Sequence, residues 1–178
     1  MTAPVTIRAA RATDADAIAQ LHAESWRIAY RGMYRDEFLD GPVFNDRRTL
    51  WRDRFAMPKA NECVLVEEEG SELIAFVCAY GAEDATFGTL LDNLHVRRAW
   101  QHRGVGQLLM RAIAQWNATN YPRAGLFLWV LEGNAPARRF YERLGAVLEE
   151  SVFCEPPGGG SVAYVRYVWP SREPLLPR

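Results

Sequence analysis

The stretch that most constrains the fold runs from a predicted strand through a glycine-containing loop into a helix. Residues 90–96 are predicted to form the strand, and Gln101-His102-Arg103-Gly104-Val105-Gly106 follows it. From Val105 onward, apolar residues recur with a helical period, and residues 126–130 form an apolar run typical of a strand buried on both faces. This order predicts a βαβ unit with parallel strands.

The remaining segments extend this unit into a mixed α/β fold. Further strands are predicted at 5–8, 63–67, 73–80, 147–153 and 162–169. Further helices are predicted from Thr13 to about Gly32, over about 35–55 with a break at Gly41-Pro42, and from Asn134 to Gly145. We therefore expect a mixed central sheet of about seven strands, flanked on both faces by about four helices. Residues 155–161 are predicted to be a flexible hairpin loop, and 170–178 a flexible tail.

Length and composition narrow the class of protein. The 178 residues fit one domain spanning 1–178 better than two. A net charge of −1 argues against nucleic acid or an anionic membrane as the main partner, and no apolar stretch is long enough to span a membrane. The first residues lack the basic and apolar regions of a secretory signal. We expect a cytoplasmic protein, either a monomer or a homodimer.

The three cysteines, Cys63, Cys78 and Cys154, are odd in number and far apart. No pair has the spacing of metal ligands, so we expect reduced, buried thiols and no metal.

The glycines of the loop suggest a place for an anion. Gly104 and Gly106 remove side chains where a helix begins, which leaves its free N–H groups open to a phosphate. Arg97, Arg98 and Arg103 could add positive charge there. On these residues alone, a pyrophosphate site and plain helix capping both remain open. A dinucleotide fingerprint is excluded because it needs a third glycine where Leu109 stands, and the Gly-Lys-Ser/Thr ending of a P-loop is absent.

Two motifs together resemble the GNAT superfamily of N-acetyltransferases. Residues 91–98 followed by Gln101–Gly106 resemble its acyl-CoA signature, Gln/Arg-x-x-Gly-x-Gly/Ala after a strand ending in valine. Asn134 followed by Phe140-Tyr141-Glu142-Arg143-Leu144-Gly145-Ala146 resembles its Asn…Tyr-x-x-x-Gly-Phe segment. The segment from Trp26 to Gly32 is similar to uncharacterised bacterial members. The resemblance implies the GNAT (acyl-CoA N-acyltransferase) fold, with acetyl-CoA as co-substrate.

The resemblance also implies roles for individual residues. Backbone groups of Leu94, His95 and Val96 would bind the pantetheine arm, and the Val96 N–H would polarise the thioester carbonyl. Asn134 would contact the cofactor, and Tyr141 would contact it and protonate the departing thiolate. The alternative for Tyr141 is a purely structural role as an aromatic residue of the core. The predicted pyrophosphate loop comprises His102, Arg103, Gly104, Val105, Gly106 and Gln107.

The general base is less clearly indicated. Some relatives carry a glutamate where this chain has Trp129, so a base at that position is excluded. Asp92 on the cofactor strand is the first candidate and Glu24 the second. Regular alternation would point His95 away from the face of Leu94 and Val96, although a β-bulge would undo this inference. A chain of waters is the remaining alternative.

The acceptor would meet the aromatic segment formed by Trp26, Tyr30 and Tyr34. The alternative for Trp26 is a helix-packing role. The implied activity is transfer of the acetyl group from acetyl-CoA to a primary amine by direct attack. Aminoglycosides, amino acids, polyamines, peptide N-termini and lysine side chains all remain open as acceptors. The competing function is a non-catalytic acyl-CoA-binding module with a regulatory or scaffolding role.

Overall fold

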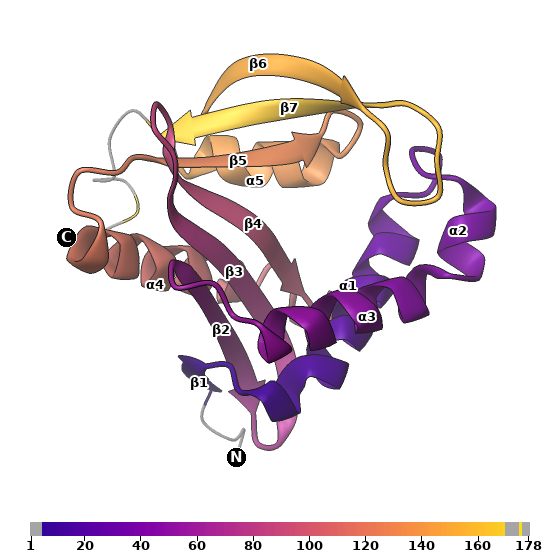
Figure 1. Cartoon of the computed structure of the whole chain (residues 1–178), viewed down its shortest axis with the longest axis horizontal. Coiled ribbons are helices and arrows are strands. Elements are labelled where there is room, and N and C mark those ends of the chain that lie inside the picture. The colour runs from indigo at the N-terminus through magenta and orange to yellow at the C-terminus, as the bar shows by residue number, and fades with distance from the viewer. Residues whose placement is uncertain (1–4, 170–174, 176–178) are drawn as a thin grey trace.

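A computed structural model describes residues 5–169 and 175. It contains the predicted seven-stranded mixed sheet, with strand order β1-β2-β3-β4-β5-β7-β6 (Figure 1). Among the strands of the described residues, only β4 and β5 pair in parallel, as the βαβ unit predicts. The strands are β1 (Val5–Ala9), β2 (Glu62–Glu69), β3 (Glu72–Asp84), β4 (Gly88–Val96), β5 (Leu126–Leu131), β6 (Val147–Cys154) and β7 (Val162–Trp169).

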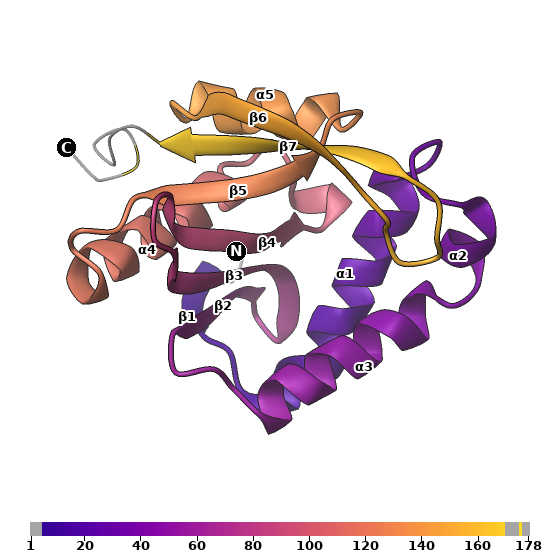
Figure 2. The same cartoon turned by 45° about the horizontal axis from the view of Figure 1, so that its top comes forward.

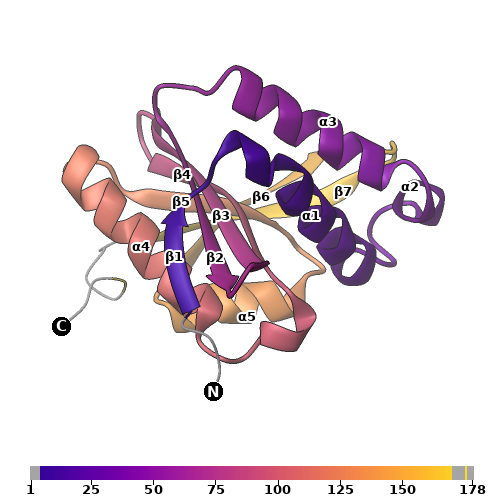
Figure 3. The same cartoon turned by 90° about the horizontal axis from the view of Figure 1, so that it is seen from below.

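Helices cover both faces of the sheet (Figures 2 and 3). The α-helices are α1 (Ala15–Ala29), α2 (Asp36–Asp40), α3 (Val43–Ala56), α4 (Val105–Asn120) and α5 (Ala135–Arg143). Helices α4 and α5 pack on one face, where Leu109, Ile113 and Leu144 meet Leu128 and Tyr167. Helices α1 and α3 pack on the other face. The break between α2 and α3 falls at Gly41-Pro42, as predicted.

The sheet opens between β4 and β5. These two strands pair only from Thr89 to Leu91, opposite Leu126 to Leu128. Beyond that point each strand continues with its other neighbour, and the two diverge (Figure 1). Backbone groups of β4 from residue 92 onward therefore face no strand on that side, which leaves them for a ligand.

A β-bulge lies where the sheet opens. Cys78 pairs with Asn93 and the next residue, Ala79, pairs with Leu91, so Asp92 is the extra residue of β4. As a result, Asp92 and Asn93 both reach Arg54 of α3. Alternation is regular after the bulge: Leu94 and Val96 pack on the α4 face, and the ring of His95 faces α1.

One expectation needs correction: Cys154 is exposed and Cys63 only partly buried, whereas Cys78 is buried as predicted; all three thiols are free. The hairpin loop at 155–161 approaches α2 closely, since a Cβ on Gly158 would stand 2.6 Å from the Cβ of Phe38. The predicted tail at 170–178 lies outside the described residues, apart from Leu175. Within the described chain, no helix is both long and apolar enough to cross a membrane.

Candidate active site at the opening between β4 and β5

The loop before α4 has the geometry of an anion site. Gly104 is the N-cap of α4 with φ of 85°, a left-handed conformation that favours glycine, and His102 also has a positive φ of 61°. The first N–H groups of the helix, at Val105, Gly106 and Gln107, have no partner within the helix. His102, Arg103 and Gln107 are exposed around them. Together with the helix dipole, these groups favour a phosphate.

Gly106 joins the two sequence motifs in space. A Cβ at this position would lie 3.3 Å from the ring of Phe140 on α5 and 3.8 Å from Val96 at the end of β4. The glycine therefore lets α4 begin close to both elements. The side chain of Gln101 donates a hydrogen bond of 3.1 Å to the carbonyl of Val96, which ties the loop to the end of β4.

The three arginines near this loop are not equivalent. Arg103 lies 5.0 Å from the ring centre of Trp100 and is exposed, as is Arg98. Arg97 instead donates to the carbonyl of Leu73 and pairs with Glu24 and Glu72. Arg97 is therefore already engaged by the protein, in contrast to the expectation that it could meet phosphates.

Tyr141 stands on α5 behind the opening. Its ring packs against Phe140 and Trp169, and the residue is 9% exposed. Burial raises the pKa of its hydroxyl, so the group stays protonated at neutral pH. Among the described residues, its hydroxyl has no hydrogen-bond partner. Asn134 caps α5 by accepting a hydrogen bond from the N–H of Ala137, which leaves its amide NH₂ free to donate.

Tyr30 lies on the opposite side of the opening, at the end of α1. Burial raises the pKa of its hydroxyl, and Tyr164, Tyr141 and Asp92 raise it further. Residues from α5, β4 and β7 therefore lie within electrostatic reach of one tyrosine on α1. The structure thus places Tyr141 and Asp92 each within electrostatic reach of Tyr30, although the three residues are far apart in the sequence.

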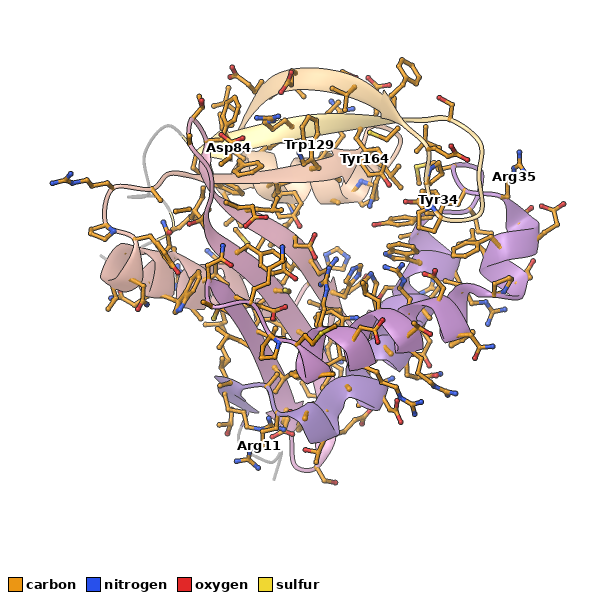
Figure 4. The ribbon with its side chains drawn as sticks, in the orientation of Figure 1. Arg11, Tyr34, Arg35, Asp84, Trp129 and Tyr164 are labelled. Atoms are coloured by element: carbon orange, nitrogen blue, oxygen red, sulfur yellow. The ribbon has the colours of Figure 1, made fainter. Side chains whose placement is uncertain are left out.

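The other two aromatic residues of the predicted acceptor region pack around Tyr30. The hydroxyl groups of Tyr34 and Tyr164 share a hydrogen bond, which links the segment after α1 to β7 (Figure 4). The ring of Trp26 contacts both Tyr30 and Tyr34, and the Arg47 guanidinium lies over the same ring, 4.1 Å from its centre. Trp26 is 7% exposed, so it packs the helices and supports Tyr30.

The two candidate bases differ in their surroundings. Asp92 is half-buried, pairs with Arg54 at 2.8 Å and lines a cleft of about 400 Å³ on the α3 side. Glu24 pairs with Arg97 at 3.3 Å and accepts from Gln20 at 2.7 Å, away from that cleft. The structure therefore places Asp92, rather than Glu24, at the opening of the sheet.

Two histidines meet beneath this site. The indole of Trp51 donates to Nδ1 of the fully buried His22, and the ring centres of His22 and His95 are 4.6 Å apart. Burial, followed by Arg47, lowers the pKa of His95 to about 3, and burial lowers that of His22 as well. Both imidazoles are therefore neutral at physiological pH.

The sequence did not single out His22, Arg47, Arg54 or Tyr164. His22 and Arg47 lie on helices as buried polar residues, which is the signal that could have marked them. Their partners come from other elements, so only the fold reveals the contacts. Within residues 5–169 and Leu175, no group of His, Cys, Asp and Glu side chains could hold a metal ion.

Comparison with known proteins identifies the family and the fold. The family model described as the acetyltransferase (GNAT) family matches residues 15–146. A probable N-acetyltransferase of Mycobacterium tuberculosis is 27% identical over 169 residues, covering 92% of each chain. The PaiA N-acetyltransferase of Thermoplasma acidophilum, solved with coenzyme A, is 18% identical with a TM-score of 0.74, over 93% of this chain and 99% of that one. Arabidopsis thaliana NAA60, solved with acetyl-CoA, is 20% identical with a TM-score of 0.63, over 93% of this chain and 98% of that one.

The chain belongs to the GNAT acetyltransferase family, because the family model spans most of its length and both sequence motifs. It is accordingly an acyltransferase of the N-acetyltransferase type.

Proposed function

We propose that this chain is a single-domain N-acetyltransferase that moves the acetyl group of acetyl-CoA to a primary amine by direct attack. One observation carries the proposal. The buried, protonated hydroxyl of Tyr141 stands on one side of the opening between β4 and β5, and Tyr30 on the other side lies within electrostatic reach of both Tyr141 and Asp92. A donor entering from the α4 face would thus meet an acceptor entering from the α1 face.

The donor side would hold acetyl-CoA through backbone groups. The pyrophosphate would bind the N–H groups at the start of α4, with His102 and Arg103 beside it. The pantetheine arm would pair with Leu94, His95 and Val96 where β5 has diverged. The NH₂ of Asn134 remains available to the cofactor because only its oxygen caps α5. The solved relatives bound to coenzyme A or acetyl-CoA support this choice of donor.

The reaction would proceed without an acyl-enzyme. The neutral amine attacks the thioester carbon, and the Val96 N–H stabilises the oxyanion. The C–S bond then breaks, and Tyr141 gives its proton to the departing thiolate. Cys78 lies near Asp92, but burial raises the pKa of its thiol well above neutrality, so it is not a nucleophile at physiological pH.

We propose Asp92 as the group that accepts the proton of the attacking amine, directly or through water. It lies at the bulge of β4, where the sheet opens, and it faces the α3 side. Glu24 is the weaker candidate, since it does not line the cleft beside Asp92. Trp26, Tyr30 and Tyr34 would shape the acceptor side around the attacking nitrogen.

The test is calorimetry with acetyl-CoA, followed by a panel of amines scored by free thiol release and by mass spectrometry of the product. We expect binding and acetylation of at least one class of amine. Tight binding of acetyl-CoA with no thiol released across amines, amino acids and peptides would overturn the proposed activity. That result would favour the competing non-catalytic acyl-CoA-binding module.

A further inference from the structure

The cleft beside Asp92 has a marked charge pattern. It measures about 400 Å³ and lies between the end of α3 and strands β3 and β4. Four carboxylates line it against two cations, which leaves two negative charges. The charged residues of the lining are Asp53, Arg54, Lys59, Glu62, Glu83 and Asp92. The whole chain carries a net charge of only −1, so the negative charge is concentrated here.

Neutral donors hold two of these carboxylates in place. The hydroxyl of Tyr80 donates to Oε1 of Glu62 at 3.0 Å. The amide of Asn61 donates to Oε2 of Glu83 at 3.0 Å and to the carbonyl of Gly81 at 2.9 Å. Such bonds fix the carboxylates without neutralising them. The wall of the cleft is therefore prepared for a positive charge.

Two cations of the protein itself, Arg54 and Lys59, already lie at this wall. The Arg54 guanidinium lies 5.6 Å from the ring centre of Tyr80 and is paired with Asp92. The ammonium of Lys59 lies 4.7 Å from the ring centre of Tyr80 and 3.6 Å from Oε1 of Glu83. Its side chain is 60% exposed, so a ligand cation can displace it at little cost. An aromatic face beside a carboxylate is a favourable place for an alkylammonium group.

Asp92 connects this cleft to the reacting centre. It lines the cleft, and it is also the first residue of β4 beyond the last pair with β5. Leu50, Met57 and Leu90 supply apolar surface along the same lining. An extended aliphatic chain could therefore lie with one end near Asp92 and the other near Tyr80.

We infer that the acceptor is an aliphatic amine with a second positive charge, such as a diamine or polyamine. One neutral amine would attack near Asp92, while the distal ammonium would bind between Tyr80, Glu62 and Glu83. This inference rests on the proposed acetyl transfer and adds the substrate class. It excludes acceptors that carry a carboxylate at the distal end, because the cleft would repel them.

The first test compares acceptors of equal length that differ only in the distal group. The probes are 1,4-diaminobutane, 1-aminobutane and 4-aminobutanoate, with the corresponding six-carbon set. We expect kcat/KM to fall in that order, with the diamine favoured over the monoamine by about five- to tenfold at low salt. Added salt should reduce this preference. Equal kcat/KM for diamine and monoamine would overturn the inference while leaving the proposed acetyl transfer intact.

The second test removes one carboxylate. Glu62→Gln keeps an oxygen that can accept from Tyr80 but loses the negative charge, and we expect the preference for the diamine to fall about threefold or more. Glu149→Gln makes the same change on the exposed surface of β6 and should leave the preference unchanged. An unaltered preference in Glu62→Gln would count against the assigned position of the distal ammonium.

Calorimetry of the CoA-saturated protein tests the proposed diamine site separately from the proposed acetyl transfer. We expect 1,4-diaminobutane to bind more tightly than 1-aminobutane in the absence of turnover. Binding of the diamine without thiol release from acetyl-CoA would support the cleft's selectivity and contradict the proposed catalysis. Failure of every diamine to bind would overturn the inference, whatever the catalytic result.

Discussion

The donor and acceptor sides of the opening are built in different ways. The donor side depends on backbone: the N–H groups at the start of α4, the glycines at 104 and 106, and the unpaired edge of β4. The acceptor side consists of side chains from α1, α3, β3, β4 and β7. The difference teaches that a local segment can encode the donor site, whereas the whole fold is needed to assemble the acceptor site.

The largest effect on turnover is expected at Tyr141, at the opening where the donor and acceptor would meet. Tyr141→Phe removes the proposed acid and should lower turnover about ten- to a thousandfold, while leaving the affinity for CoA nearly unchanged. Tyr121→Phe, on a tyrosine after α4 that packs against Trp116, is the matched control and should retain activity. Steady-state kinetics and calorimetry measure the two quantities. Unchanged turnover of Tyr141→Phe with a good acceptor would remove its assigned role.

The second prediction separates the two candidate bases. Asp92→Asn should lower kcat/KM at neutral pH by about tenfold or more. Glu24→Gln should change it less than about threefold, because Glu24 does not line the cleft beside Asp92 and its pair with Arg97 is partly exposed. Thermal unfolding of Asp92→Asn shows whether losing the ion pair between Asp92 and Arg54 destabilises the protein. A larger kinetic loss in Glu24→Gln than in Asp92→Asn would reverse the assignment.

The third prediction concerns the histidines beneath the acceptor side. The pKa of His95 is lowered to about 3 in the folded protein, against 6.5 when unperturbed, so below pH 6.5 the unfolded state binds a proton that the folded state does not. Stability should therefore fall as the pH falls from 6.5 toward 3. His95 contributes at most about 1.4 kcal/mol per pH unit.

Urea unfolding at a series of pH values measures this slope. His95→Gln replaces the imidazole with a neutral amide and should flatten the pH dependence below pH 6.5, while His22 retains its own contribution. An identical slope in the variant and the wild type would contradict the lowered pKa of His95.

The smallest effect tests the donor side alone. Gly104 and Gly32 both have a positive φ, of 85° and 76°, and an added Cβ would have open space at both positions. Alanine at either position should cost about 1–2 kcal/mol of stability. Only Gly104→Ala should also weaken CoA binding, by about three- to tenfold, because the strain falls on the loop that holds the phosphates. Equal CoA affinity in both variants would argue against that loop as the phosphate site.

The sequence predicted most of the architecture. All seven strands were expected, and so were the break at Gly41-Pro42 and the placement of helices on both faces. These features follow from local periodicity and from residues that interrupt helices. One local expectation failed: Cys154 on β6 is exposed, although a buried thiol was expected.

The acceptor side could not be predicted to the same depth. The bulge at Asp92 depends on how β4 registers against β3, which residue spacing alone does not reveal. The cleft depends on Tyr80 and Glu62 meeting across two strands, with Arg54 arriving from α3. Aromatic residues at Trp26, Tyr30 and Tyr34 indicated the region, but not its charge. These side chains come from segments far apart in the sequence, so the sequence pattern alone does not show that they meet.

Direct transfer between the two sides is the central claim, and initial-rate kinetics test it most directly. Rates measured while acetyl-CoA and the best amine are both varied should give intersecting double-reciprocal lines, because both substrates must occupy the opening together. No acetylated protein should accumulate when acetyl-CoA is mixed with the enzyme alone, since burial keeps the Cys78 thiol protonated. Parallel lines, with an acetyl group recovered on the protein, would contradict the account.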